Sequence, residues 1–137
     1  MINLELFYSP NACSLVPYLA LKEAGAQFNI RPINLAKKEQ MSEEYLKINP
    51  KHRVPVLVID GEPLTENVSI LLWIDHNFPH ADLLPKQSMH RAHAVSFLAW
   101  CASSIHPALT PNALPQRFCN LPNTAVFGKL QNRCGRA

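Results

Sequence analysis

The sequence predicts an α/β domain with the element order βαβ–ββα, followed by a partial all-α region. Near the N-terminus, a strand, a helix and a second strand follow one another. Further on, a continuous apolar run is followed by an Asp-Gly pair, which is typical of a two-residue hairpin turn. Capping residues then precede a third helical segment. With 137 residues, the chain is long enough to bury one good core.

The first three elements form a βαβ unit. In residues 4–8, apolar and polar side chains alternate, which predicts a short strand. Residues 13–24 form the predicted helix, with Leu15 and Leu19 on one face. A second strand is predicted around residues 28–30. The helix between these strands implies a right-handed crossover and therefore a parallel pair.

The next elements form a ββα unit. After a short helix at residues 43–47, the apolar run at residues 56–59 predicts a strand buried on both faces. Asp60-Gly61 then reverses the chain, so residues 62–64 return antiparallel. Apolar periodicity in residues 68–74 predicts the third helix. This order of elements is the thioredoxin-like plan.

The domain organisation follows from the same pattern. We expect a thioredoxin-like domain at residues 1–79, a linker at 80–87 and a partial helical domain at 88–118. Residues 119–137 form a divergent tail in which we expect no ordered element, because the apolar periodicity disappears there.

The helix that begins at Ser88 carries an apolar stripe. Its members lie at multiples of four residues along the helix: Met89, Phe97, Cys101 and Ile105. This spacing predicts that Cys101 is buried. Pro107 and Pro111 are expected to end the helix.

Composition and charge exclude some classes of function. The chain is 47% hydrophobic and 17% charged, with no run long enough for a membrane span and no N-terminal signal sequence. The nine basic and ten acidic residues before Arg117 nearly cancel, so the net charge of +3 comes from the tail. We therefore expect no nucleic-acid partner, no membrane partner and a cytoplasmic location in which the four cysteines are free thiols.

Cys13 is the first candidate for a reactive residue. It lies at the start of the predicted helix, where backbone amides and the helix dipole stabilise a thiolate. This position predicts a lowered pKa and faster alkylation of Cys13 than of Cys101. The alternative is a small core residue, as free cysteines often are. No second cysteine stands three residues away, so a dithiol redox cycle lacks its partner.

The Val54-Pro55 bond is the second candidate feature. Because it lies between the βαβ and ββα units and just before a strand, we expect it to be cis. A cis bond would leave the amide and carbonyl of Val54 free to pair with an extended peptide. The alternative is an ordinary trans proline that starts a strand.

Glu66 and Asn67 are the third candidate feature, because they follow a strand and begin a helix. Helix-terminal amides and the Asn67 side chain can hold a ligand carboxylate, while Glu66 can accept from the ligand's ammonium group. The alternative is simple helix capping.

The histidines do not predict a metal site. His90 and His93 are three residues apart on a helix, and a metal site would need more ligands than that pair. His106 stands alone at the end of the fourth predicted helix.

Taken together, these motifs resemble those of the beta class of bacterial glutathione S-transferases. Residues 9–15 are similar to the cysteine-bearing first turn of that class, and residues 49–56 to the segment that leads into its cis-proline. Residues 64–67 are similar to its γ-glutamyl-binding motif. The similarity continues through residues 103–109 and extends to about Phe118.

This resemblance implies three catalytic residues. Cys13 would face the sulfur of glutathione and can form a mixed disulfide with it. Ser14 would form a hydrogen bond near that sulfur. His106 would approach the thiol from the helical domain, and it is followed by Pro107 where a lysine is common in the class.

The resemblance also implies the residues that bind glutathione. Val54, next to Pro55, would pair its backbone with the cysteinyl residue of glutathione. Glu66 and Asn67 would bind the γ-glutamyl end, and Asn67 stands where the family usually has Ser.

The function implied by the resemblance is detoxification. The chain would conjugate reduced glutathione to small hydrophobic electrophiles as a homodimer, with thiol-transfer or peroxidase side activity through Cys13. Glutathione would be a co-substrate, and no cofactor or metal is implied. Two alternatives stay open: monothiol glutaredoxin-like disulfide exchange, and a non-catalytic glutathione-binding or interaction module left by truncation. Beyond Phe118 the sequence no longer resembles the family, so we expect an incomplete helical domain.

Overall fold

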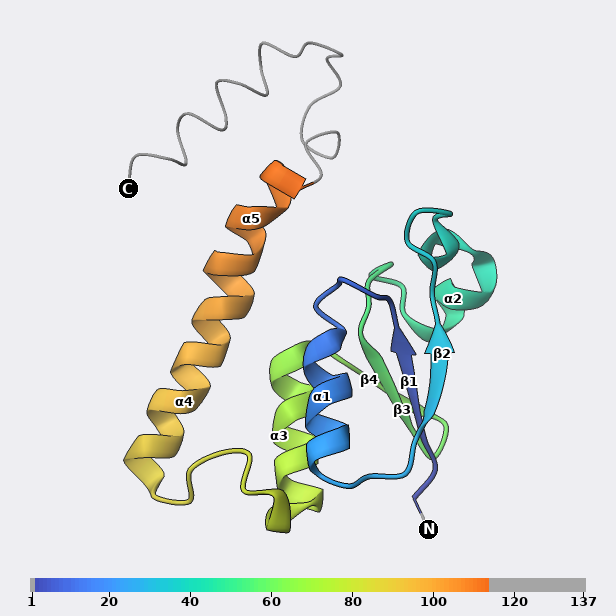
Figure 1. Cartoon of the computed structure of the whole chain (residues 1–137). Helices are drawn as coiled ribbons and strands as arrows, with labels where there is room; N and C mark the ends of the chain where they lie inside the picture. The colour runs from blue at the N-terminus through green and yellow to red at the C-terminus, as the bar shows by residue number, and fades with distance from the viewer. Residues whose placement is uncertain (1, 114–137) are drawn as a thin grey trace. The chain divides into compact units, whose positions relative to one another are not determined.

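The fold of the chain is given by a computed structural model that describes residues 2–113 (Figure 1). The predicted tail at residues 119–137 lies outside the described residues. The chain forms two compact units, of which the first ends at Ala94 and the second begins at Val95. The domain boundaries expected from the sequence stay predictions.

A four-stranded mixed sheet forms the centre of the first unit (Figure 1). Its strands are β1 (Leu4–Tyr8), β2 (Asn29–Pro32), β3 (Val56–Ile59) and β4 (Glu62–Thr65), in the order β2-β1-β3-β4. β1 pairs parallel with β2 and antiparallel with β3, and β3 pairs antiparallel with β4. The predicted βαβ–ββα order and the thioredoxin-like fold class are therefore confirmed.

The turn between β3 and β4 is the predicted hairpin. Asp60 and Gly61 both have positive φ, at 49° and 92°, as a two-residue type I′ turn requires. The Asp60 side chain also accepts a hydrogen bond from the Asn3 amide at 2.8 Å, which ties the turn to the start of β1.

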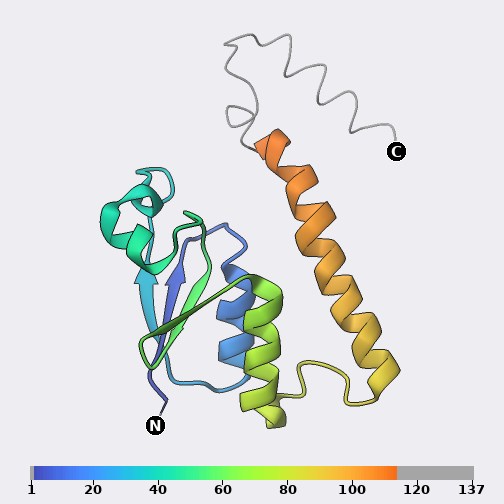
Figure 2. The same ribbon diagram turned by 180° about the vertical axis from the view of Figure 1, so that it is seen from behind.

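Helices α1 (Leu15–Glu23) and α3 (Asn67–Asn77) lie side by side on one face of the sheet (Figure 1, Figure 2). The core between these layers is formed by buried apolar residues from both helices and the sheet. They are Leu4, Leu6, Ala20, Leu21, Ala24, Ala26, Leu57, Ile70 and Ile74.

Leu15 and Leu19 face outward, although the sequence placed them together on one apolar face. They are 40% and 55% exposed. The helix buries a second stripe instead, with the spacing i, i+3, i+4 and i+7: Pro17, Ala20, Leu21 and Ala24. This stripe is built mainly of small residues, which allow α1 to approach α3 and the sheet closely.

The other face of the sheet is covered by the short helix α2 (Glu43–Ile48) and its flanking loops. Here Tyr45, Val54 and Val56 are buried. The prediction that residues 56–59 are buried on both faces is only half right, because Val58 and Ile59 are partly exposed.

A long helical segment crosses from the first unit into the second. It consists of α4 (Ser88–Trp100), one π-helical stretch (Cys101–Ile105) and α5 (His106–Ala113). The sequence predicted that Pro107 and Pro111 end this helix, but α5 includes both prolines and continues to Ala113. The π-helical stretch ends at Ile105, two residues before Pro107, and its altered hydrogen-bond pattern accommodates the N–H that proline lacks inside a continuous helix.

The apolar stripe of this helix is more open than its spacing predicts. Phe97 is 58% exposed and Met89 is 60% exposed, and Cys101 is only half-buried. The prediction that Cys101 is buried is therefore wrong, because its side chain is only partly buried. Within the described part of the chain, no helix is both long and apolar enough to cross a bilayer.

Candidate functional site

Cys13 lies in the loop between β1 and α1, one residue before the N-cap Ser14. Its side chain is half-buried, and Sγ donates a hydrogen bond to the backbone carbonyl of Val54 at 3.3 Å. This contact joins two segments that are 41 residues apart in the sequence. The two candidate features are therefore neighbours in the fold.

The environment of Cys13 raises the pKa of its thiol, contrary to the expectation from the sequence. Burial is the largest cause, because it disfavours the charged thiolate. The Cys13 backbone amide and the Arg53 charge lower this pKa, and the Glu66 charge raises it, but burial prevails. The resting form of Cys13 at neutral pH is the protonated thiol.

We expect Cys13 to be alkylated more slowly in the folded protein than in the urea-denatured chain at neutral pH. The raised pKa leaves a smaller thiolate fraction at every pH below it, and only the thiolate attacks iodoacetamide. Peptide mass spectrometry across a pH series should place half-maximal reactivity of the folded protein above the free-thiol pKa of about 8.5. Faster reaction of folded Cys13 would show that its pKa is lowered.

The Ser14 hydroxyl does not face the Cys13 sulfur. Ser14 is fully buried, and its Oγ accepts from the Ser9 amide and donates to the Ser9 carbonyl, both at 3.0 Å. A hydroxyl has one proton to donate, and Ser9 already receives it. Ser14 therefore closes the β1–α1 loop, and its expected bond near the glutathione sulfur is not available in this conformation.

The Val54-Pro55 bond is cis, as expected. Within residues 2–113, the Val54 backbone amide has no hydrogen-bond partner, while the carbonyl accepts only from Cys13. The preceding carbonyl, of Arg53, is held by two buried side chains at 2.7 Å each, the Tyr45 hydroxyl and the Asn49 amide. Burial raises the pKa of Tyr45 to about 12, so its hydroxyl stays a donor.

Asn67 connects the start of α3 to the cysteine loop. Its Nδ2 donates to the Cys13 carbonyl at 3.1 Å, whereas its Oδ1 is buried without a partner among the described residues. Glu66 immediately precedes it, with an exposed side chain that makes no capping hydrogen bond to α3. The geometry thus gives no support to the capping alternative for Glu66.

Lys51 is a residue of this region that the sequence analysis did not single out. Its Nζ lies 3.0 Å from Oε1 of Glu66 and 3.2 Å from Oγ1 of Thr65. Lys51 lies within the motif at residues 49–56, but a pairing across 15 residues has no periodic signal in the sequence.

Three of the non-glycine residues with positive φ lie in the loops of the candidate site. Asn11, His52 and Glu66 have positive φ values of 58°, 58° and 72°, which non-glycine residues rarely adopt. Each lies one or two residues before a predicted site residue. Lys38, Asp60 and Asp82 have positive φ outside this region, so the backbone conformation alone does not define the site.

The site therefore combines Cys13, Val54 and Asn67 through direct hydrogen bonds, with Glu66 beside Asn67. His106 lies in the second unit, as the exposed first residue of α5. Its approach to Cys13 stays a prediction.

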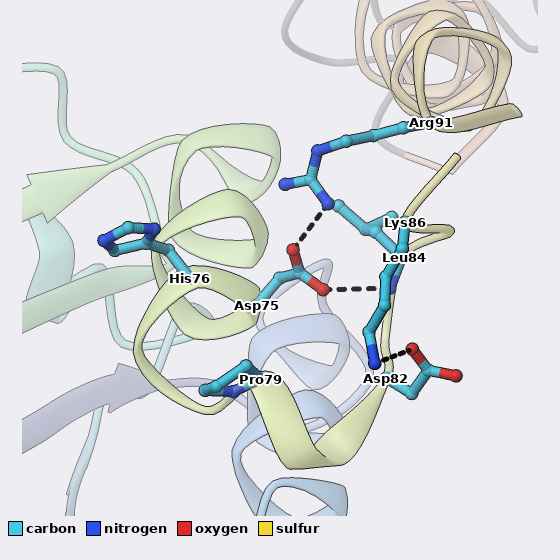
Figure 3. A pocket seen from close by; sticks show the side chains of 7 residues that line it. All are labelled: Asp75, His76, Pro79, Asp82, Leu84, Lys86 and Arg91. Carbon is cyan, nitrogen blue, oxygen red and sulfur yellow. Dashed lines mark hydrogen bonds and ion pairs between the residues drawn. The ribbon is translucent and has the colours of Figure 1, made fainter. Parts of the chain in front are cut away.

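A separate hollow of about 240 Å³ lies beside the C-terminal half of α3 (Figure 3). Seven residues line it: Asp75, His76, Pro79, Asp82, Leu84, Lys86 and Arg91. Asp75 accepts hydrogen bonds from the Leu84 amide at 3.0 Å and from Arg91 at 2.7 Å. These contacts hold the segment after α3 against Asp75 of that helix, so we interpret the hollow as a structural feature and not as a ligand site.

The fold defines a thioredoxin-like domain with a single cysteine at the start of its first helix. The model of the family "Glutathione S-transferase, N-terminal domain" matches residues 3–76. The chain therefore belongs to the glutathione S-transferase family, and the resemblance noted in the sequence is confirmed.

Curated relatives match over most of this chain. Glutathione S-transferase GstA of Escherichia coli O157:H7 is 36% identical over 111 residues, which are 79% of this chain and 55% of that protein. A probable maleylacetoacetate isomerase of Caenorhabditis elegans is 32% identical over 100 residues, 73% of this chain and 46% of that protein. The chain thus spans about half the length of these relatives.

Solved structures of glutathione transferases also match over most of this chain. A glutathione transferase homologue from Sulfitobacter with bound glutathione superposes with a TM-score of 0.85 at 28% identity, over 97% of this chain and 64% of that one. The beta-class glutathione S-transferase of Sphingomonas chungbukensis has a TM-score of 0.74 at 36% identity, over 96% of this chain and 66% of that one.

Proposed function

We propose that the chain binds reduced glutathione and conjugates it to small hydrophobic electrophiles. The observation that carries this proposal is the hydrogen-bonded group of Cys13, Val54 and Asn67, which offers an unpaired backbone amide beside a thiol. Family membership and a similar solved structure with bound glutathione support it.

The peptide backbone of glutathione pairs with Val54. The free Val54 amide donates to the carbonyl of the cysteinyl residue, as in the addition of a strand to a sheet edge. The γ-glutamyl end then lies at the start of α3. There the first amides of the helix receive its carboxylate, and Glu66 accepts from its ammonium group.

The sulfur of glutathione lies next to Cys13 in this arrangement. Burial keeps Cys13 protonated, and in the free chain its S–H donates to the Val54 carbonyl. When glutathione binds, this S–H turns from the Val54 carbonyl to the glutathione thiolate and stabilises that anion. The thiolate attacks the electrophilic carbon, a C–S bond forms, and the leaving group departs with the electron pair of its bond to carbon. The protonated state makes Cys13 a poor attacking group, which disfavours disulfide exchange as the main activity.

We further propose a homodimer, a cytoplasmic location and a contribution of His106 to the thiol site. These three proposals follow from the family resemblance. The proposal that the electrophile is a small apolar molecule follows from it as well. Thiol transfer through a Cys13–glutathione mixed disulfide is the side activity of this proposal.

Two assays on the full chain test the proposed activity. With reduced glutathione and an aromatic halide, we expect formation of the thioether at a rate above the uncatalysed reaction. With a glutathione mixed disulfide as substrate, we expect a slower reaction that Cys13→Ala abolishes. Mixed-disulfide reduction without conjugation would favour the glutaredoxin-like alternative, and binding without either reaction would favour the non-catalytic module.

A further inference from the structure

We propose that Lys51 is a positioning residue that holds Glu66 for the γ-glutamyl end of glutathione. This inference rests on the proposed function, and it assigns a role to a residue outside the expected site. Its basis is the pair of contacts that Lys51 makes across the chain to the turn between β4 and α3.

The contacts of Lys51 fix one side of the Glu66 carboxylate. Nζ binds Oε1 of Glu66 at 3.0 Å and Oγ1 of Thr65 at 3.2 Å, so the ammonium group bridges two consecutive residues. Within residues 2–113, the second carboxylate oxygen, Oε2, has no partner. A carboxylate can accept several hydrogen bonds, so this oxygen remains available for the ligand's ammonium group.

The backbone from which Lys51 extends is itself fixed. The Lys51 amide donates to Oδ1 of Asn49 at 3.1 Å, and Asn49 is only 2% exposed. The same Asn49 side chain holds the Arg53 carbonyl just before Val54. One buried asparagine therefore sets both the origin of the Lys51 side chain and the segment that pairs with the peptide.

Glu66 needs such support because its backbone is unusual. Its φ of 72° and ψ of 128° lie outside the regions that non-glycine residues prefer. In addition, 61% of its side chain is exposed, so without Lys51 the carboxylate samples several rotamers. Holding one rotamer lowers the entropic cost of binding the ammonium group.

The expected effect on glutathione affinity is modest because both side chains of the ion pair are exposed, Lys51 at 54% and Glu66 at 61%. Pairs of this kind are weak, so we expect Lys51→Ala to weaken glutathione binding about two- to fivefold. Lys51→Arg should restore most of the affinity. The matched control is Lys86→Ala, which removes another exposed lysine paired with a carboxylate, Asp82 at 3.4 Å, and should leave affinity unchanged.

Titration calorimetry with three thiol peptides distinguishes positioning from direct contact. If Lys51 acts through Glu66, Lys51→Ala weakens the binding of glutathione and of γ-glutamylcysteine equally, and it leaves cysteinylglycine, which lacks the γ-glutamyl group, unaffected. If Lys51 instead contacts the glycyl carboxylate, the loss disappears with γ-glutamylcysteine and persists with cysteinylglycine, which would overturn the inference.

The Glu66→Gln background separates this inference from the proposed function. There, Lys51→Ala should have little further effect, because the carboxylate that it holds is gone. If the two substitutions weaken glutathione binding independently in the double variant, Lys51 does not act through Glu66. This result would overturn the positioning role but not the proposal that the chain binds glutathione. A wild-type chain that does not bind glutathione at all would overturn the proposed function itself. Thermal unfolding of each variant should stay unchanged.

Discussion

Replacing Glu66 with alanine should weaken the binding of reduced glutathione by about tenfold. A hydrogen bond between charged groups contributes about 1.5–3 kcal/mol, which corresponds to roughly ten- to hundredfold in Kd. The lower end applies here because 61% of the Glu66 side chain is exposed to water before a ligand covers it. Titration calorimetry on the full chain measures the loss directly.

The control for this prediction is Lys86→Ala, which lies after α3 and outside the proposed site. Retention on immobilised glutathione should follow the same order, provided that the peptide is attached through its sulfur and keeps its ammonium group free. Equal affinity of both variants would mean that Glu66 is only a residue at the start of α3, and the γ-glutamyl assignment would be wrong.

Replacing Asp75 with alanine should lower the free energy of unfolding by about 2–3 kcal/mol. Its carboxylate is 11% exposed and receives both the Leu84 amide and the Arg91 guanidinium (Figure 3). Removing it leaves a half-buried amide and a guanidinium without their acceptor. The cost stays below that of a fully buried pair because Arg91 is 35% exposed and can regain water.

Asp82→Asn is the matched control, because Asp82 also pairs with a cation but is 69% exposed. Asparagine also tolerates the positive φ of 49° at this position, which alanine does not. We expect this variant to lose less than about 0.5 kcal/mol. Urea denaturation followed by circular dichroism gives both values. If the Asp75 variant is as stable as the Asp82 variant, the contacts of Asp75 with Leu84 and Arg91 do not contribute to the stability of the fold.

The order of the elements was predictable because it depends on local patterns. The apolar run of β3, the Asp-Gly turn and the alternation in β1 each lie within a few residues, and the structure has all three where the sequence places them. The cis bond at Val54-Pro55 was predictable for a different reason, namely its position between two recognisable units.

The chemistry of Cys13 was not predictable from the same local reasoning. Its place at the start of a helix indicates a lowered pKa, but the segment at Val54 buries the thiol from 41 residues away. The hydrogen bonds between the Ser14 hydroxyl and Ser9 were hidden for a related reason, because they form within the folded loop. The spacing of residues in the sequence does not show that a distant segment buries a thiol. It also does not show that a neighbouring group takes the one proton of a hydroxyl.

The orientation of α1 was open in the sequence because two apolar stripes overlap on it. The stripe of Leu15 and Leu19 has the larger side chains, yet the structure buries the stripe that contains Ala20 and Leu21. Close packing against α3 decides between the two stripes, and that contact depends on the tertiary fold. The pairing of Lys51 with Glu66 was hidden in the same way.

In the proposed function, Cys13, Val54 and Asn67 form one binding site for glutathione. Titration of the ¹⁵N-labelled full chain with reduced glutathione, followed by amide chemical shifts, tests it most directly. We expect saturable shifts that are largest at the amides of these three residues and that fit one dissociation constant. Absence of saturable shifts, or shifts confined to the hollow around Asp75, would contradict it.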